Sequence, residues 1–178
     1  MHPDLDAWLP GPQVRTRHRA SAKADADRLW QAAEGVRIRD ASVLGRAVRW
    51  RIPGTSADQS FRDLLREYPF AVIAEGTRWS VSGMCGRIWT LRPDYPRVEG
   101  LDDFLAWDEG GTVRVLLAHW VEPDGPGRNA LLSEGRIKPV DGAAGYRLRA
   151  LWAVVGHFER LIGGEVLPIA AGRAELPG

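Results

Sequence analysis

Residues 143–162 read AAGYRLRALWAVVGHFERLI and form the longest helical pattern in the chain. The large apolar residues of this stretch recur at steps of three and four, which places them on one face of a helix. They are Leu148, Leu151, Trp152, Val155, Phe158 and Ile162. A helix with one broad apolar face needs a second layer to cover it, and the strands that precede it in the chain are the expected partner.

Those strands are predicted from residue alternation and from turn residues. The clearest pair is Val113 to Val121 and Ala130 to Lys138, because residues 122–129 read EPDGPGRN and form a turn-rich link typical of a hairpin. Further strands are predicted at residues 14–22, 70–75, 79–81 and 84–91. Short helices are predicted at residues 24–34, ended by Gly35, and at residues 61–68.

Two further segments are less regular. In Arg46 to Ile52 the apolar Val48, Trp50 and Ile52 alternate with basic residues, so we expect a strand with one apolar and one basic face. Arg49 and Arg51 would then point the same way, either to bind a carboxylate or phosphate or to face water. Residues 101–106 are expected to form a strand or a turn of helix.

Length and composition exclude several classes of protein. The chain has 178 residues, 44% of them hydrophobic and 26% charged, which is typical of one soluble globular domain. We expect an irregular lead-in at residues 1–13 and a single domain at residues 14–178. The net charge of +1 gives no overall attraction to nucleic acid or to a membrane, so any basic site must be local.

The N-terminal residues lack the features of a signal peptide, and no apolar stretch is long enough to span a bilayer. A cytoplasmic, soluble protein without membrane insertion is therefore expected. A single cysteine, Cys85, allows neither an internal disulfide nor a thiolate metal site. It could be a nucleophile between Gly83 and Gly86, or a small buried core residue.

The order of these elements resembles the helix-grip fold of the START, Bet v 1 and polyketide cyclase superfamily (SRPBCC). The resemblance covers roughly residues 14 to 175 and is carried by three phrases, GMCGRIW at 83–89, SEGRI at 133–137 and LPIAAGRAE at 167–175, with Tyr146 and Trp152 in the last helix. They are closest to an uncharacterised bacterial branch of that superfamily. One departure is the set Gly163, Gly164, Pro168 and Gly172, which we expect to kink or fray the terminal helix.

The resemblance implies an α+β fold in which a curved antiparallel sheet wraps a long C-terminal helix, with two short helices near the N-terminal part. It implies an apolar cavity between the sheet and that helix, and a lipid- or polyketide-like hydrophobic small molecule as the partner. The alternatives are a polyketide cyclase or dehydratase that acts in the same cavity, and a dimerising interaction module without a ligand. Fold alone does not choose between them.

Catalytic motifs give little guidance, since the chain lacks a phosphate-binding glycine loop, a nucleophile elbow, a zinc-protease motif and a paired-cysteine motif. We expect no cofactor and no metal. The histidines at positions 2, 18, 119 and 157 are too widely spaced to form a local ligand pair.

His119 is the first candidate for chemistry, because it shares a strand face with Val113, Val115 and Leu117. It could act as an acid or base in the cavity, or be a core histidine bonded to backbone. Glu134 and Arg136 lie two residues apart on the partner strand and share a face. They could form a buried pair, anchor a polar group of the ligand, or form a solvated cross-strand pair. In the enzyme alternative, His119 would act in the cavity together with Glu134 or Arg136 as catalytic residues.

Tryptophan is unusually frequent, with eight residues against four phenylalanines and three tyrosines. Such rings fill a core or line a cavity for a flat apolar ligand. The residues predicted to line the cavity are Trp50, Trp79, Trp89, His119, Trp120, Glu134, Trp152 and Val155.

Overall fold

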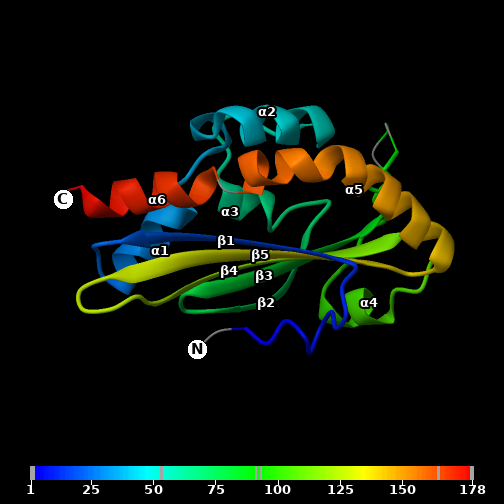
Figure 1. Ribbon diagram of the computed structural model, residues 1–178, viewed down its shortest axis with the longest axis horizontal. Helices are drawn as coiled ribbons and strands as arrows, with labels where there is room; N and C mark the ends of the chain where they lie inside the picture. The colour runs from blue at the N-terminus through cyan, green and yellow to red at the C-terminus, as the bar shows by residue number, and fades with distance from the viewer. Residues whose placement is uncertain (1–2, 53, 91, 93, 164, 177–178) are drawn as a thin grey trace.

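A five-stranded antiparallel sheet forms the centre of the molecule, with its strands in the order β1-β5-β4-β3-β2 (Figure 1). The structure is a computed structural model that describes residues 3–52, 54–90, 92, 94–163 and 165–176, without the side chains of residues 51 and 157–163. The strands are β1 (Val14–Ala22), β2 (Ala71–Gly76), β3 (Trp79–Gly86), β4 (Val113–Pro123) and β5 (Asn129–Pro139). The first strand therefore joins the sheet beside the last one.

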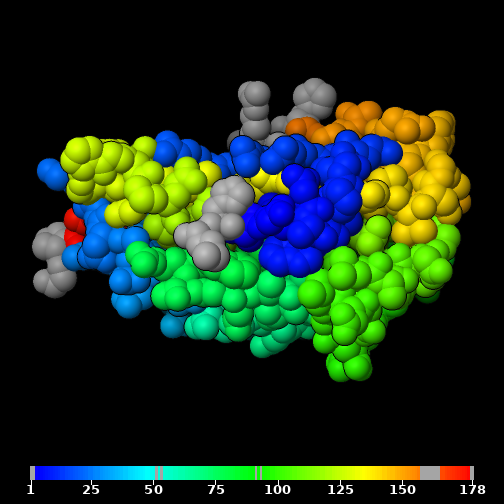
Figure 2. Space-filling view, turned by 90° about the horizontal axis from the view of Figure 1, so that it is seen from below, coloured from blue at the N-terminus to red at the C-terminus, as the bar shows by residue number. Residues whose placement is uncertain are grey.

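Most helices lie on one face of this sheet, which we call the inner face (Figure 1). They are α1 (Ala26–Glu34), η1 (Ile38–Asp40), α2 (Ser42–Arg51), α3 (Phe61–Leu64), α5 (Gly142–Gly163) and α6 (Val166–Glu175). The opposite, outer face is covered by residues 3–13 and by α4 (Leu101–Ala106). Figure 2 shows this side of the molecule, with the N-terminal residues lying across its middle.

The β4 strand shows how the two faces alternate. Val113 and Val115 pack under α5, in a cluster that includes Leu148. Leu116 and Ala118 pack instead with Leu5, Leu9 and Phe104 on the outer face. A strand that is buried on both sides explains why β4 and β5 are rich in apolar residues at both odd and even positions.

Residues 3–13 contribute more to the core than the predicted lead-in would. Leu5 and Leu9 are buried on the outer face, and the ring of Trp8 stacks on that of Trp79 with centroids 6.5 Å apart. The outer face of the sheet would otherwise expose a large apolar area to water, and this segment removes that area from solvent.

The prediction of a strand at Arg46 to Ile52 was wrong, because these residues belong to helix α2 and its C-cap. Leu44, Val48 and Ile52 recur every four residues and pack against the core beneath α2. The alternation that suggested a strand arises from Trp50, which is 74% exposed and belongs to the solvent side of the helix.

Other boundaries differ less. The predicted helix at 61–68 is limited to the four residues of α3, and residues 101–106 form helix α4. The predicted strands at 79–81 and 84–91 form one continuous strand, β3, which ends at Gly86. Helix α5 ends at Gly163 and α6 begins at Val166, as expected from the glycine pair. Pro168 lies in the first turn of α6, where its missing N–H leaves no hydrogen bond unmade.

The α+β class and the pairing of an antiparallel sheet with a long C-terminal helix agree with the helix-grip arrangement predicted from the sequence. In the described part of the chain, no helix combines the length and apolar character needed to cross a bilayer.

Candidate functional site

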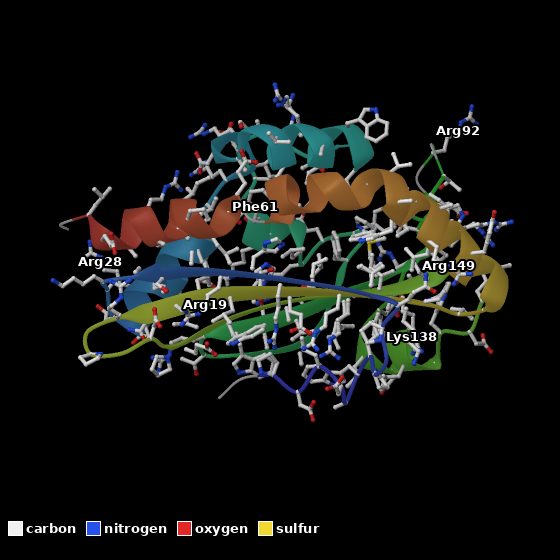
Figure 3. All side chains as sticks on the ribbon, in the orientation of Figure 1. Arg19, Arg28, Phe61, Arg92, Lys138 and Arg149 are labelled. Atoms are coloured by element: carbon white, nitrogen blue, oxygen red, sulfur yellow. The ribbon has the colours of Figure 1, made fainter. Side chains whose placement is uncertain are left out.

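A pocket of about 610 Å³ lies on the inner face of the sheet, between strands β2 to β4 and helices α1 and α3. Apolar and polar side chains share its walls, and the large apolar ones include Trp30 from α1, Phe61 from α3, Leu131 from β5 and Leu167 from α6. In Figure 3, Phe61 lies between the helix layer and the sheet. The pocket is large enough for a drug-sized molecule.

A row of polar residues crosses the inner face at this point. His18 of β1 is opposite Ser133 of β5, which is opposite His119 of β4. His119 is in turn opposite Ser80 of β3, and Ser80 is opposite Glu75 of β2. Directly opposed residues on antiparallel strands point to the same face, so the five side chains form one transverse row, which we call the polar row.

His119 lies at the centre of the polar row and borders the pocket. Its Nε2 atom is 3.2 Å from the Oγ atom of Ser133. Burial lowers the pKa of His119 to about 4, so the ring is neutral near neutral pH. A neutral imidazole has one N–H donor and one nitrogen acceptor, and it can therefore bind either a carbonyl or a hydroxyl group.

A second, smaller pocket of about 210 Å³ lies under helix α5. Leu117, Trp152 and Val155 line it, together with Thr16 and Ser133. Because Ser133 borders this pocket and contacts His119, which borders the larger one, the two pockets lie on either side of this polar contact.

Ion pairs between different elements surround the mouth of the larger pocket. Arg62 of α3 pairs with Glu34 of α1 at 3.1 Å, and Arg66 pairs with Glu75 of β2. Arg78, in the turn between β2 and β3, lies 3.5 Å from Asp27 of α1. These residues are partly exposed, so each pair contributes little stability, but together they connect the elements around the opening.

Four of the predicted lining residues border a pocket. Trp79 and His119 border the larger pocket, and Trp152 and Val155 border the smaller one. Trp89 instead packs in the core under α5, where the Arg147 guanidinium lies 5.9 Å from its ring centroid.

Two predicted tryptophans lie elsewhere. Trp50 is on the exposed side of α2, because the segment is a helix rather than a strand. Trp120 is 2% exposed and packs in the outer-face core, where its indole N–H donates to Glu122 over 3.4 Å. It alternates with His119 along β4, and adjacent strand residues point to opposite faces.

Glu134 and Arg136 form a buried pair, with Arg136 Nε donating to Glu134 Oε1 at 2.7 Å. Arg15 and Arg17 of β1 bind the same carboxylate at 2.8 and 2.7 Å. Burial alone would raise the pKa of Glu134, but hydrogen bonds from the three guanidinium groups lower it to about 2.

This network belongs to the outer face of the sheet. Arg136 also donates to Asp6 at 2.6 Å and to the Leu9 carbonyl oxygen at 3.1 Å, both in the N-terminal segment. Although Arg136 borders the smaller pocket, its guanidinium group is bound on the other side of the sheet. The structure thus separates Glu134 and the charged end of Arg136 from His119.

The remaining candidates lie away from the pockets or outside the description. Cys85 is fully buried in the outer-face core, and burial raises the pKa of its thiol to about 12. A thiol with that pKa stays protonated and is a poor nucleophile. Arg49 is exposed on α2, while the side chains of Arg51 and His157 and the whole of His2 lie outside the described part of the chain.

Sequence reasoning missed the serines and the helix residues of the larger pocket. Ser80 and Ser82 border it from β3, and Trp30 borders it from α1. Ser80 is found once the register of β3 against β4 is known, since it is opposite His119. Within the described residues, no group of three or more His, Cys, Asp or Glu side chains is arranged to hold a metal ion.

Comparison with known proteins gives structural likenesses only. No protein-family model matches the chain, and no curated protein matches its sequence.

Three solved structures illustrate these likenesses. A hypothetical protein from Helicobacter pylori is 12% identical, with a TM-score of 0.41, over 96% of this chain and 94% of that one. The Zhui aromatase/cyclase from Streptomyces sp. R1128 is 16% identical, with a TM-score of 0.38, over 93% of this chain and 98% of that one. The di-domain aromatase/cyclase BexL of the BE-7585A biosynthetic pathway is 10% identical, with a TM-score of 0.32, over 97% of this chain and 54% of that one.

Proposed function

We propose that this protein binds an apolar small molecule in the larger pocket of the inner face. The observation that carries the proposal is the pocket itself, about 610 Å³ in volume and bounded by the rings of Trp30 and Phe61 on the helix side. Ligand sites in proteins are typically concave and mostly apolar, with a few polar groups that fix the ligand's orientation.

Two residues of the polar row, together with Ser82, supply those orienting groups. Ser80, Ser82 and the neutral His119 border the pocket from the sheet, opposite the apolar helix side. We infer that the ligand has an apolar body, which packs against the helices, and at least one oxygen or nitrogen atom that hydrogen-bonds to the sheet. The charged side chains that border the pocket are already held in ion pairs. An uncharged polar group therefore suits the imidazole and the two hydroxyl groups, which provide no full charge.

The proposal can be tested with Nile red, an uncharged and flat fluorescent probe with a carbonyl group. Ser80→Phe puts a ring into the larger pocket from the sheet, and the matched variant Thr16→Phe puts the same ring into the smaller one. We expect Ser80→Phe to weaken Nile red binding by about ten-fold or more and Thr16→Phe to leave it nearly unchanged. Circular dichroism shows whether both variants fold.

Native mass spectrometry of gently purified protein provides the natural ligand's mass when it is retained. Wild-type protein that folds but does not bind Nile red would contradict the proposal. Loss of binding in Thr16→Phe alone would place the ligand under α5, in the smaller pocket, and would overturn the assignment to the larger one.

A further inference from the structure

The solvent side of helix α2 combines an exposed tryptophan with arginines. Leu44, Val48 and Ile52 pack toward the core, which leaves Val43, Arg46, Arg49 and Trp50 on the side facing water. Trp50 is 74% exposed and Val43 is 36% exposed. In Figure 1, α2 lies above α5 and α6, on the side of the helix layer farthest from the sheet.

The basic residues of this surface have no acidic neighbour within helix α2 itself. Residues 42–51 contain arginines at 46, 49 and 51 and no acidic residue. Among the described side chains, Arg46 and Arg49 make no ion pair, whereas Arg37 and Arg39, just before α2, both pair with Asp58. The α2 helix is therefore a local basic site on a chain whose net charge is only +1.

An acidic segment lies on the opposite side of the molecule. Residues 99–109, which contain α4, carry five acidic residues and no basic one: Glu99, Asp102, Asp103, Asp108 and Glu109. In Figure 1, α4 lies on the other side of the sheet from α2. This separation of charge would turn α2 toward a negatively charged surface and α4 away from it.

We propose that the exposed side of α2 docks on an anionic phospholipid surface. Arg46 and Arg49 would bind headgroup phosphates, which suit the planar guanidinium group. Trp50 would insert its ring at the level of the headgroups, where indole rings are enriched. The arginines and the exposed tryptophan and valine thus combine charge attraction with a small apolar contact, the two contributions by which peripheral segments bind anionic lipid.

A second copy of the chain is a less suitable partner for this surface. A two-fold symmetric dimer through α2 would bring Arg46 and Arg49 of both copies into one interface, with no acidic residue of α2 to balance their repulsion. A lipid surface instead provides many phosphates without such repulsion. The inference does not depend on the proposed ligand pocket, since it rests on α2 alone.

Docking of α2 on a lipid surface would nevertheless be coupled to the larger pocket through Glu165. The Glu165 carboxylate accepts hydrogen bonds from the backbone N–H groups of Ser42, Val43 and Leu44, at the start of α2. The two residues after Glu165, Val166 and Leu167, border the larger pocket. A displacement of α2 on a membrane would therefore act on the pocket wall.

Co-sedimentation with vesicles tests the proposal on the full chain. We expect wild-type protein to bind vesicles of phosphatidylcholine mixed with phosphatidylserine and not vesicles of phosphatidylcholine alone. Each arginine removed in Arg46→Gln and Arg49→Gln should lower the affinity about five-fold, and Trp50→Ala should lower it by a similar factor. Binding should weaken as salt concentration rises.

Matched controls separate a local site from a general effect of charge. The double variant Arg97→Gln/Arg128→Gln removes the same charge from exposed positions outside α2, and Tyr146→Ala removes another exposed aromatic ring. These controls should bind mixed vesicles as the wild type does.

Three results would overturn the proposal: wild-type protein that stays unbound at low salt, α2 variants that bind normally, and controls that lose as much as the α2 variants. Light scattering measures the molar mass and therefore tests the dimer alternative. A wild-type dimer that Trp50→Ala converts to a folded monomer would assign the surface to a second copy.

Discussion

Polar groups on the two faces of the sheet are satisfied in different ways. On the outer face, Glu134 binds Arg15, Arg17 and Arg136, and Arg136 binds Asp6 in the N-terminal segment. On the inner face, His119 contacts Ser133 and borders a pocket. The outer-face charges thus join β1, β5 and the N-terminal segment to one another. The inner-face groups border an open pocket instead.

The largest effect is expected from Glu134→Gln. The substitution removes the carboxylate that these three guanidinium groups share. Among the described side chains, Arg136, which is 3% exposed, then keeps Asp6 alone as an acidic partner. Loss of one partner of a buried pair typically costs about 3–5 kcal/mol, and we expect a decrease of that size in the free energy of unfolding, measured in urea. A decrease below about 1 kcal/mol would show that the network is not a stabilising element.

The second effect concerns pH and the inner face. Because burial lowers the pKa of His119 from 6.5 to about 4, the unfolded chain binds a proton more readily than the folded one between these values. Stability should therefore fall as pH decreases from 6.5 toward 4, by up to about 3 kcal/mol from this group.

The variant His119→Gln isolates that contribution. Urea unfolding across this pH range should show a smaller slope in His119→Gln than in the wild type. The contribution of Glu134 to stability is lost at lower pH, because the pKa of its carboxyl group is about 2 in the folded protein and 4.5 in the unfolded chain. Identical slopes in both proteins would mean that His119 is not buried in the folded state.

A smaller effect is expected from Glu165→Gln, which keeps the shape of the side chain but removes its charge. The carboxylate caps the N-terminus of α2, where Ala41 offers no side-chain hydrogen bond. The loss of a cap and of a favourable charge at a helix N-terminus is worth about 1 kcal/mol. Thermal unfolding measures it, and Glu67→Gln serves as a control on an exposed carboxylate outside α2.

The smallest effect is expected from Arg66→Gln at the pocket mouth. Its partner Glu75 is about half exposed, so water already solvates the pair. The free energy of unfolding should change by less than about 1 kcal/mol. A change as large as that of Glu134→Gln would remove the distinction between exposed and buried charges on which the comparison rests.

Local sequence patterns predicted most of the sheet and the long helix. The predicted strand at residues 14–22 coincides with β1, and the hairpin and α5 were placed within a few residues. The α2 helix was missed because Trp50 is on the solvent side, so alternation with Val48 and Ile52 imitated a strand. In the structure Trp50 is exposed, whereas Val48 and Ile52 pack against the core. That difference depends on tertiary packing, which the local sequence pattern does not reveal.

The candidate site was also predictable only in part, because alternation along one strand says nothing about its neighbours. The shared face of His119 and Val115 follows from alternation along one strand, and so does the shared face of Glu134 and Arg136. Alternation does not say which face the N-terminal segment covers. It also does not place Ser80 opposite His119, because that pairing depends on the register between two strands.

The hydrogen bonds of Glu165 also bear on the order in which the chain can fold. Helix α2 receives its cap from a residue 123 positions later than Ser42, and β1 receives its sheet partner only from β5. The ribosome synthesises the chain from the N-terminus, so β1 and α2 are made before the residues that pair with them. Neither element can complete its contacts until β5 and Glu165 have been synthesised. Such distant contacts slow folding and join early and late segments in one cooperative unit. Fragments that stop before β5 therefore lack the partners for β1 and α2, and this domain should become resistant to proteolysis only after β5 and Glu165 have been synthesised.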